Sequence, residues 1–128
     1  MGTPRDIRSA YRTNAVATAG PAQLLVMLLD RLVLDAERGQ AALAAGDHDE
    51  ANRQLQHAQA IVTELQATLE VDGMPAGREL LALYDYLQRR LITANISRDL
   101  VAAAEAVKLS QELCDTWRQA ALLAAASA

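Results

Sequence analysis

Apolar residues recur along positions 51–69 at alternating intervals of four and three residues, and this spacing limits the fold more than any other feature of the sequence. The positions are Ala51, Leu55, Ala58, Val62, Leu65 and Leu69. An α-helix makes one turn every 3.6 residues, so these intervals place all the side chains along one face. A half-buried strand would instead alternate apolar and polar residues. We therefore predict a helix that buries one face against other parts of the chain.

Three further segments carry apolar stripes with helical spacing. In segment 21–45 the stripe consists of Leu25, Leu28, Leu29, Leu32 and Val33. In the segment that follows residue 77, the stripe consists of Leu80, Tyr84, Leu87, Leu91 and Ala94. The last segment carries two stripes: Leu100, Ala104, Val107, Gln111 and Cys114 on one side, and Ala106, Leu109, Leu113 and Trp117 on another. Aromatic residues, which strands favour, make up only 3% of the chain, so we predict an all-α protein.

Residues that end and start helices separate these segments. Gly20-Pro21 precedes the first, and proline suits the first helical turn because its missing N–H would be unpaired there. Gly46 is predicted to end that helix, since glycine adopts positive φ without a steric penalty. Asp47 is followed by Glu50 at the spacing of a capping box, which predicts the start of the second helix.

The longest break, residues 71–77, contains two glycines and a proline and is predicted to be a loop. Ser97 is predicted to be the N-cap of the last helix. Four long helices joined by short connections pack antiparallel to their neighbours, so we predict an up-down-up-down four-helix bundle. We expect residues 1–17 to be a flexible N-terminal segment, residues 18–122 to form the bundle and residues 123–128 to be a short tail.

Charge and cysteine content argue against several functional classes. The formal net charge of −4 argues against nucleic-acid binding, which needs clustered Lys and Arg. Cys114 is the single cysteine, so we expect no disulfide and a reducing compartment. The start MGTPRDIRSAY lacks the apolar region of a signal peptide. The longest apolar runs, 24–29 and 120–126, are far shorter than the ~20 residues that span a bilayer. We therefore expect a cytoplasmic protein without membrane insertion.

No metal, cofactor or catalytic site is expected. A di-iron site in a bundle needs Glu-x-x-His pairs, but Ala45 and Gln54 stand three positions before His48 and His57. No zinc, redox or phosphate-loop motif occurs. Cys114 lies on a predicted apolar face, where a thiol has little reactivity. We therefore expect a protein that binds another polypeptide and is not an enzyme.

A histidine phosphotransfer protein is an alternative interpretation. Such domains are also acidic four-helix bundles, and His57 lies in mid-helix outside the predicted apolar stripe. They usually carry a lysine and then a glycine shortly after the histidine, whereas Ala60, Ile61 and Val62 stand here. A solvated surface histidine near Arg53 is the simpler interpretation. A helical adaptor for an unrelated client protein is a further alternative.

Two of the predicted helices are apolar around more of their circumference than a bundle requires. A core-facing helix needs one stripe about 100° wide, yet Leu24, Met27 and Leu34 lie beside the first stripe. They indicate either an unusually deep core or a groove for a partner, because large exposed apolar patches tend to mark interaction sites.

Short motifs along most of the chain resemble those of the FliS family, the flagellar export chaperones for flagellin. They are Tyr11, TAGP at 18–21, Leu24, MLLD at 27–30, AQAIV at 58–62, Glu64-Leu65, LYDYL at 83–87, Leu91, Ala94-Asn95 and Trp117. The Leu-Tyr-Asp-Tyr block with the later Ala-Asn is the most specific part. Gly20, Leu29 and Arg31 depart from residues common in the family, which affects the surface at the start of the first helix but not the expected fold.

The resemblance implies a cytosolic chaperone that binds the disordered C-terminal segment of flagellin. It would prevent premature polymerisation and deliver flagellin to the flagellar type III export apparatus, so a component of the export gate is a second expected partner. The N-terminal segment around Tyr11 is expected to fold over part of the client groove and to move when the client arrives. Whether the free chaperone is a monomer or a homodimer stays open.

The resemblance also suggests residues that contact the client. The predicted set is Tyr11, Leu24, Met27, Leu28, Tyr84, Tyr86, Leu87, Leu91 and Asn95. Four of these also fit the predicted core, so a core role stays open for Leu28, Tyr84, Leu87 and Leu91. Tyr86 lies off the apolar stripe, and Asn95 is either a contact or a helix cap. Trp117 is expected to have a structural role.

Overall fold

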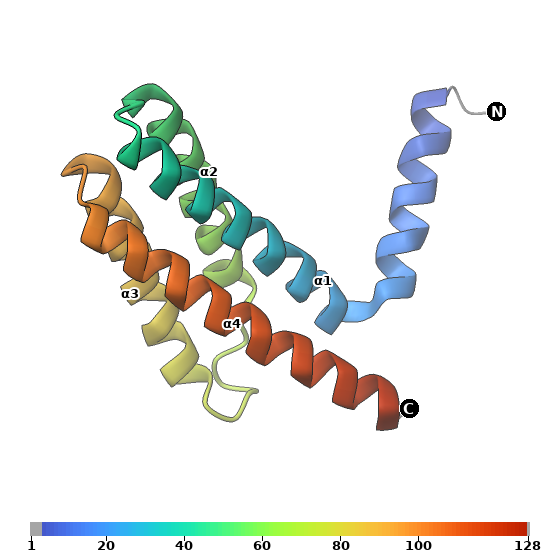
Figure 1. Cartoon of the computed structure of the whole chain (residues 1–128). Coiled ribbons are helices and arrows are strands. Elements are labelled where there is room, and N and C mark those ends of the chain that lie inside the picture. The colour runs from blue at the N-terminus through green and yellow to red at the C-terminus, as the bar shows by residue number, and fades with distance from the viewer. Residues whose placement is uncertain (1–3, 128) are drawn as a thin grey trace.

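The computed structural model describes residues 4–127, with side chains at residue 20 and residues 23–126. It consists of four helices: α1, Pro4–Ala44; α2, His48–Thr68; α3, Gly77–Ile96; and α4, Leu100–Ser127. Consecutive helices run antiparallel, and α1 and α3 each pack against both α2 and α4 (Figure 1). The predicted all-α four-helix bundle is confirmed. Within the described residues, no helix has the length and apolar character needed to span a membrane.

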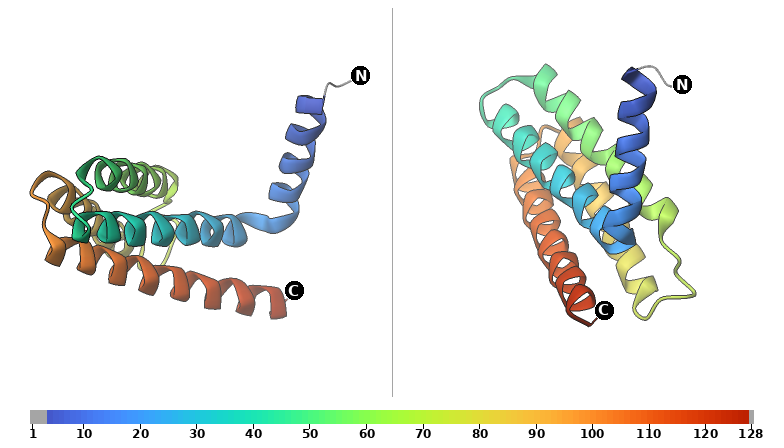
Figure 2. Two further views of the ribbon diagram at one scale, coloured as in Figure 1. Left: turned by 45° about the horizontal axis from the view of Figure 1, so that its top comes forward. Right: turned by 90° about the vertical axis from the view of Figure 1, so that its right-hand side faces the viewer.

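Gly20 divides α1 into two helical pieces. Its φ of 79° and ψ of 164° are non-helical, in a region that essentially only glycine adopts. Residues 4–19 are helical and leave the bundle at Gly20, while the rest of α1 lies along α2 and α4 (Figure 2). The sequence correctly placed the start of the bundle part of α1 after Gly20, but it predicted no helix before that glycine.

Asp47 caps the N-terminus of α2, as predicted. Its Oδ1 accepts a hydrogen bond from the N–H of Glu50 at 3.2 Å. The capping box is only half formed, because the Glu50 carboxylate accepts hydrogen bonds from Gln54 and Arg53. Both hydrogen bonds lower the pKa of Glu50, and the one from Gln54 has the larger effect. Gly46 has a φ of 75° and ends the preceding helix as expected.

Asp99 caps α4, so the prediction of Ser97 as N-cap is wrong. Oδ1 of Asp99 accepts hydrogen bonds from the N–H groups of Val101 at 2.9 Å and Ala102 at 3.1 Å. Ser97 is the C-cap of α3, and its N–H donates to a carbonyl in the last turn of that helix. Arg98, with a φ of 51°, then reverses the chain. The turn therefore uses Ser97 to end one helix and Asp99 to start the next.

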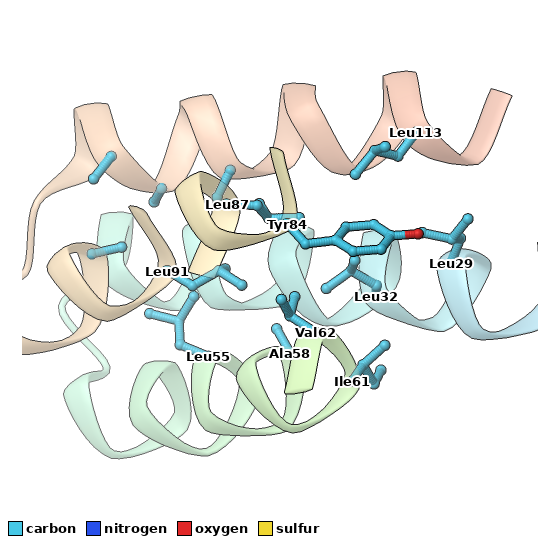
Figure 3. Close-up of a cluster of buried hydrophobic side chains, with 14 of the residues drawn as sticks. Leu29, Leu32, Leu55, Ala58, Ile61, Val62, Tyr84, Leu87, Leu91 and Leu113 are labelled. Atoms are coloured by element: carbon cyan, nitrogen blue, oxygen red, sulfur yellow. The ribbon is translucent and has the colours of Figure 1, made fainter. Parts of the chain in front are cut away.

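The predicted stripes of α2 and α3 meet the inner face of α1 in one core (Figure 3). Leu29 and Leu32 of α1 are fully buried there. Gly39 allows α1 to approach α2 closely, because a Cβ at this position would lie 2.7 Å from Cδ2 of Leu55. The core thus fixes the spacing of the helices as well as their order.

The first of the two apolar stripes predicted for α4 is not its buried face. Leu100 is 47% exposed, and only the last two apolar members of that stripe, Val107 and Cys114, are buried. Ser110 is fully buried instead, and its hydroxyl donates to the carbonyl of Ala106 at 2.7 Å. The second stripe does face the core, where it consists of Ala106, Leu109, Leu113 and Trp117.

Candidate functional site

Two adjoining pockets open where the α2–α3 loop meets the ends of the helices. The inner pocket, about 520 Å³ in volume, is lined mainly by Leu25, Leu65, Leu69, Met74, Tyr84 and Trp117. The outer pocket, about 540 Å³, lies between α3 and α4 and is lined mainly by Met74, Leu80, Leu83, Leu109, Leu113 and Trp117. Met74 and Trp117 border both pockets, so we call the two together the loop-end groove.

The loop that carries Met74 is held by a close backbone contact. A Cβ on Gly77 would lie 2.4 Å from the carbonyl oxygen of Val71, so only glycine fits there. Ala76 adopts a φ of 60°, in the left-handed region, and the N–H of Gly77 donates to the carbonyl of Met74 at 3.0 Å. The loop therefore folds back on itself and places Met74 between the two pockets.

The margin of the loop-end groove is acidic. Glu79 and Glu112 are exposed at the outer pocket, and Glu70 is exposed at the inner one. None of the three forms an ion pair within the described part of the chain. An apolar groove with a polar rim has the anatomy of a protein-binding surface. It can bury apolar side chains of a partner polypeptide.

Potential metal ligands and nucleophiles are few among the described residues. These residues include no group of three or more potential metal ligands. Burial and the hydrogen-bonded Asp30 carboxylate raise the pKa of the Cys114 thiol to about 11, so the reactive thiolate is scarce near neutral pH. Nδ1 of His57 contacts Oδ2 of the buried Asp35. This contact occupies Nδ1 of His57 and joins α2 to α1.

Comparison with known proteins identifies the family. Residues 4–124 match the family model described as flagellar protein FliS. The chain belongs to the FliS family. The flagellar secretion chaperone FliS of Bacillus subtilis (strain 168) is 34% identical over 112 residues, which cover 88% of this chain and 84% of that relative. The protein of the same name from Escherichia coli (strain K12) is 30% identical over 113 residues, 85% of this chain and 82% of the relative.

The fold agrees with that of a solved bacterial protein. A crystal structure of a bacterial flagellar chaperone aligns with a TM-score of 0.72 over 90% of this chain and 96% of that one. The sequence identity in this alignment is 21%, so the likeness supports the fold alone. The sequence relatives are named as chaperones and not as enzymes.

Three of the residues predicted to contact a client lie in the core of this FliS-family bundle. Tyr84 is 1% exposed, and Leu87 and Leu91 are fully buried. The sequence left open whether these three residues contact the client or form the core, and their burial in the free chain favours the core role. Tyr84 also borders the inner pocket, and burial raises its pKa.

The part of α1 that follows Gly20 supplies apolar surface at the loop-end groove. Leu24 and Leu28 are half-buried, and Met27 is 57% exposed. Leu25, between them, lines the inner pocket. Tyr11 lies outside the residues whose side chains are described, so its predicted contact stays a prediction.

Tyr86 and Asn95 lie on different faces of α3. The Tyr86 hydroxyl donates to Glu105 of α4, and this hydrogen bond raises the pKa of Tyr86. The guanidinium of Arg89 lies 5.9 Å from the centroid of the Tyr86 ring. Nδ2 of Asn95 instead donates to Oδ1 of Asn52 on α2 at 3.0 Å. The described members of the predicted set are therefore spread over the core, the surface of α1 and two faces of α3.

The sequence did not identify most of the loop-end groove. It predicted Met74 only as part of a loop, placed Leu109 in a second apolar stripe without assigning it to core or groove, and predicted a structural role for Trp117. Trp117 is half-buried and packs against the core while it borders both pockets. The available signal was the second apolar stripe of α4, which exceeds what one core face needs, together with a methionine in a Gly/Pro loop.

Proposed function

We propose that this chain is a cytoplasmic export chaperone for flagellin. It binds the disordered C-terminal segment of flagellin, prevents premature polymerisation and delivers the subunit to the flagellar type III export apparatus. It has no enzymatic activity. The observation that carries the proposal is the apolar loop-end groove in a member of a family whose relatives are named flagellar secretion chaperones.

A disordered client suits a shallow groove of this kind. A segment that folds on binding can wrap a large surface, although part of its interaction energy is lost to its own ordering. Leu83, Leu109 and Met74 offer apolar surface for its side chains. The exposed glutamates at the margin favour client residues that are neutral or basic next to the buried ones.

We also propose that residues 1–17 cover part of the groove in the free chaperone and move when the client binds. Gly20 supports this, because it joins the helix formed by residues 4–19 to the part of α1 that contains Leu25. A glycine at this point allows the N-terminal helix to take more than one direction. The first part of the chain would then compete with the client for the groove.

Titration calorimetry of the full chain with the C-terminal segment of flagellin from the same organism tests the function. We expect a Kd below about 1 μM and a large negative heat-capacity change, because apolar surface is buried. A variant lacking residues 1–17 should bind at least as tightly. Failure of both proteins to bind would contradict the proposal.

A matched pair of truncations tests whether the groove is the binding site. Met74→Ala removes the side chain shared by the two pockets and should weaken binding about tenfold, as for a central interface residue. Val101→Ala is the control, because Val101 is 72% exposed and lines neither pocket. Equal affinities of the two variants would place the client elsewhere on the protein.

A further inference from the structure

Met74 and Trp117 form the wall between the two pockets of the loop-end groove, since both residues line each pocket. The two side chains differ in how firmly they can hold a position. Methionine is unbranched and adapts to its surroundings. Tryptophan is large and rigid, and it carries one polar N–H that usually finds a partner when it is buried. The position of the Trp117 indole therefore decides how the groove is divided.

Trp117 lies where the core face of α4 ends and the groove begins. It is half-buried and packs against the core. Leu113, one turn before it on α4, is buried. Ala120, about one turn after it, is exposed and lines the outer pocket. The inner side of Trp117 is thus attached to the bundle, and its outer side is available to a partner.

Tyr84 carries a hydroxyl group at a place where the core needs only an aromatic ring. It is the largest of the fully buried side chains, at 1% exposed, and its ring extends from α3 into the core (Figure 3). Phenylalanine would fill nearly the same space without a polar atom. Burial of a hydroxyl group costs free energy unless the group is hydrogen-bonded. Apolar packing alone therefore does not explain the hydroxyl group of Tyr84.

The hydroxyl group of Tyr84 is hydrogen-bonded to the side chain of Trp117. An indole N–H can only donate, so the Tyr84 oxygen is the acceptor. Both residues line the inner pocket, and they come from different helices, α3 and α4. The hydrogen bond therefore joins a residue that is fixed in the core to a residue that forms the wall of the groove.

We propose that Tyr84 is a positioning residue of the loop-end groove, whose hydroxyl group holds the Trp117 indole in the wall between the two pockets before a client arrives. A groove whose wall is already in place loses less free energy to the ordering of side chains when it binds. Tyr84 acts through Trp117, which agrees with its burial. This inference rests on the proposed function, because it takes the disordered segment of flagellin as the client.

The fluorescence of Trp117 tests this positioning without a client, because Trp117 is the only tryptophan in the chain. Tyr84→Phe removes the hydroxyl group and keeps the buried ring. We expect acrylamide to quench Trp117 faster in this variant and the fluorescence anisotropy to fall, both measured well below its melting temperature. Ser110→Ala is the matched control, because it also removes a fully buried hydroxyl group and Ser110 lines neither pocket. Equal quenching in the wild type and Tyr84→Phe would overturn the proposal.

A double-mutant cycle tests whether the hydroxyl group acts on the client through Trp117. Tyr84→Phe should bind the flagellin C-terminal segment about fivefold more weakly than the wild type, and Ser110→Ala should bind as the wild type does. In a Trp117→Phe background, Tyr84→Phe should cause no further loss, because no indole remains to be held. A purely structural role of Tyr84 would give the same loss in both backgrounds.

The outcomes separate this inference from the proposed function. Absence of client binding by the wild type overturns both. Client binding by the wild type overturns the inference alone if Tyr84→Phe leaves the quenching of Trp117 unchanged or weakens binding equally in both backgrounds. If Trp117→Phe does not fold, the quenching experiment still decides, because it uses only Tyr84→Phe and Ser110→Ala.

Discussion

At the scale of single residues, Gly39 is required by packing and not by backbone conformation. It is buried near the C-terminal end of α1, and the described glycines with positive φ are Gly20 and Gly46. A Cβ on Gly39 would lie 2.7 Å from Cδ2 and 2.8 Å from Cγ of the fully buried Leu55. Carbon atoms do not approach so closely, so Gly39 sets the distance between α1 and α2.

Gly39→Ala should destabilise the protein although alanine favours helix formation. The gain in helix propensity is roughly 0.5–1 kcal/mol, whereas overpacking a core costs about 1–3 kcal/mol. Urea unfolding should therefore show a net loss of free energy of unfolding. The double variant Gly39→Ala/Leu55→Val should lose less than the sum of the two single variants. Additive losses would show that the contact does not limit the packing.

At the scale of helices, the sequence predicted α2 and α3 well and α4 poorly. The stripes of α2 and α3 are flanked by polar residues, so the spacing identifies one buried face. α4 carries Ala or Leu on most sides, and its spacing is compatible with two faces. Ser110 is fully buried and Leu122 is 66% exposed, which no hydrophobic pattern predicts. Only contact with α1 and α3 decides which side of α4 is inside.

The two polar residues around the α3–α4 turn should differ in their effect on stability. Asp99→Ala removes the acceptor for two N–H groups of α4 and should cost about 1 kcal/mol in free energy of unfolding. Ser97→Ala should change it little, because Ser97 contributes its backbone N–H to the end of α3. Chemical denaturation of both variants checks this. A larger loss for Ser97→Ala would mean that its side chain holds the turn.

At the scale of the whole molecule, the loop-end groove is a product of the fold. Its lining comes from α1, α2, the α2–α3 loop, α3 and α4, so no local pattern contains it. The family motifs predicted a client surface but could not separate core residues such as Leu87 from lining residues such as Leu83. Those two positions differ by one turn of α3, yet Leu87 is fully buried whereas Leu83 lines the outer pocket.

Client binding should raise the stability of the whole bundle. A ligand that binds only the folded state at 100 times its Kd adds about 2.7 kcal/mol, which corresponds to a rise of roughly 8 °C in Tm for a chain of this size. Thermal unfolding followed by circular dichroism, with the flagellin segment or a scrambled peptide, measures this. An unchanged Tm at a concentration that saturates the calorimetric titration would mean that the segment also binds unfolded chains.

The break in α1 depends on one residue, which makes the sequence at that point sensitive to mutation. Apart from the adjoining part of α1, none of the described side chains lies within 4 Å of the place that a Cβ on Gly20 would take, so space there does not exclude other residues. The backbone conformation does exclude them, because essentially only glycine adopts a φ of 79° with a ψ of 164°. Every missense change of a glycine codon introduces a Cβ, so each one would drive residues 4–19 toward a different direction. A single nucleotide change is therefore enough to redirect the N-terminal helix during evolution.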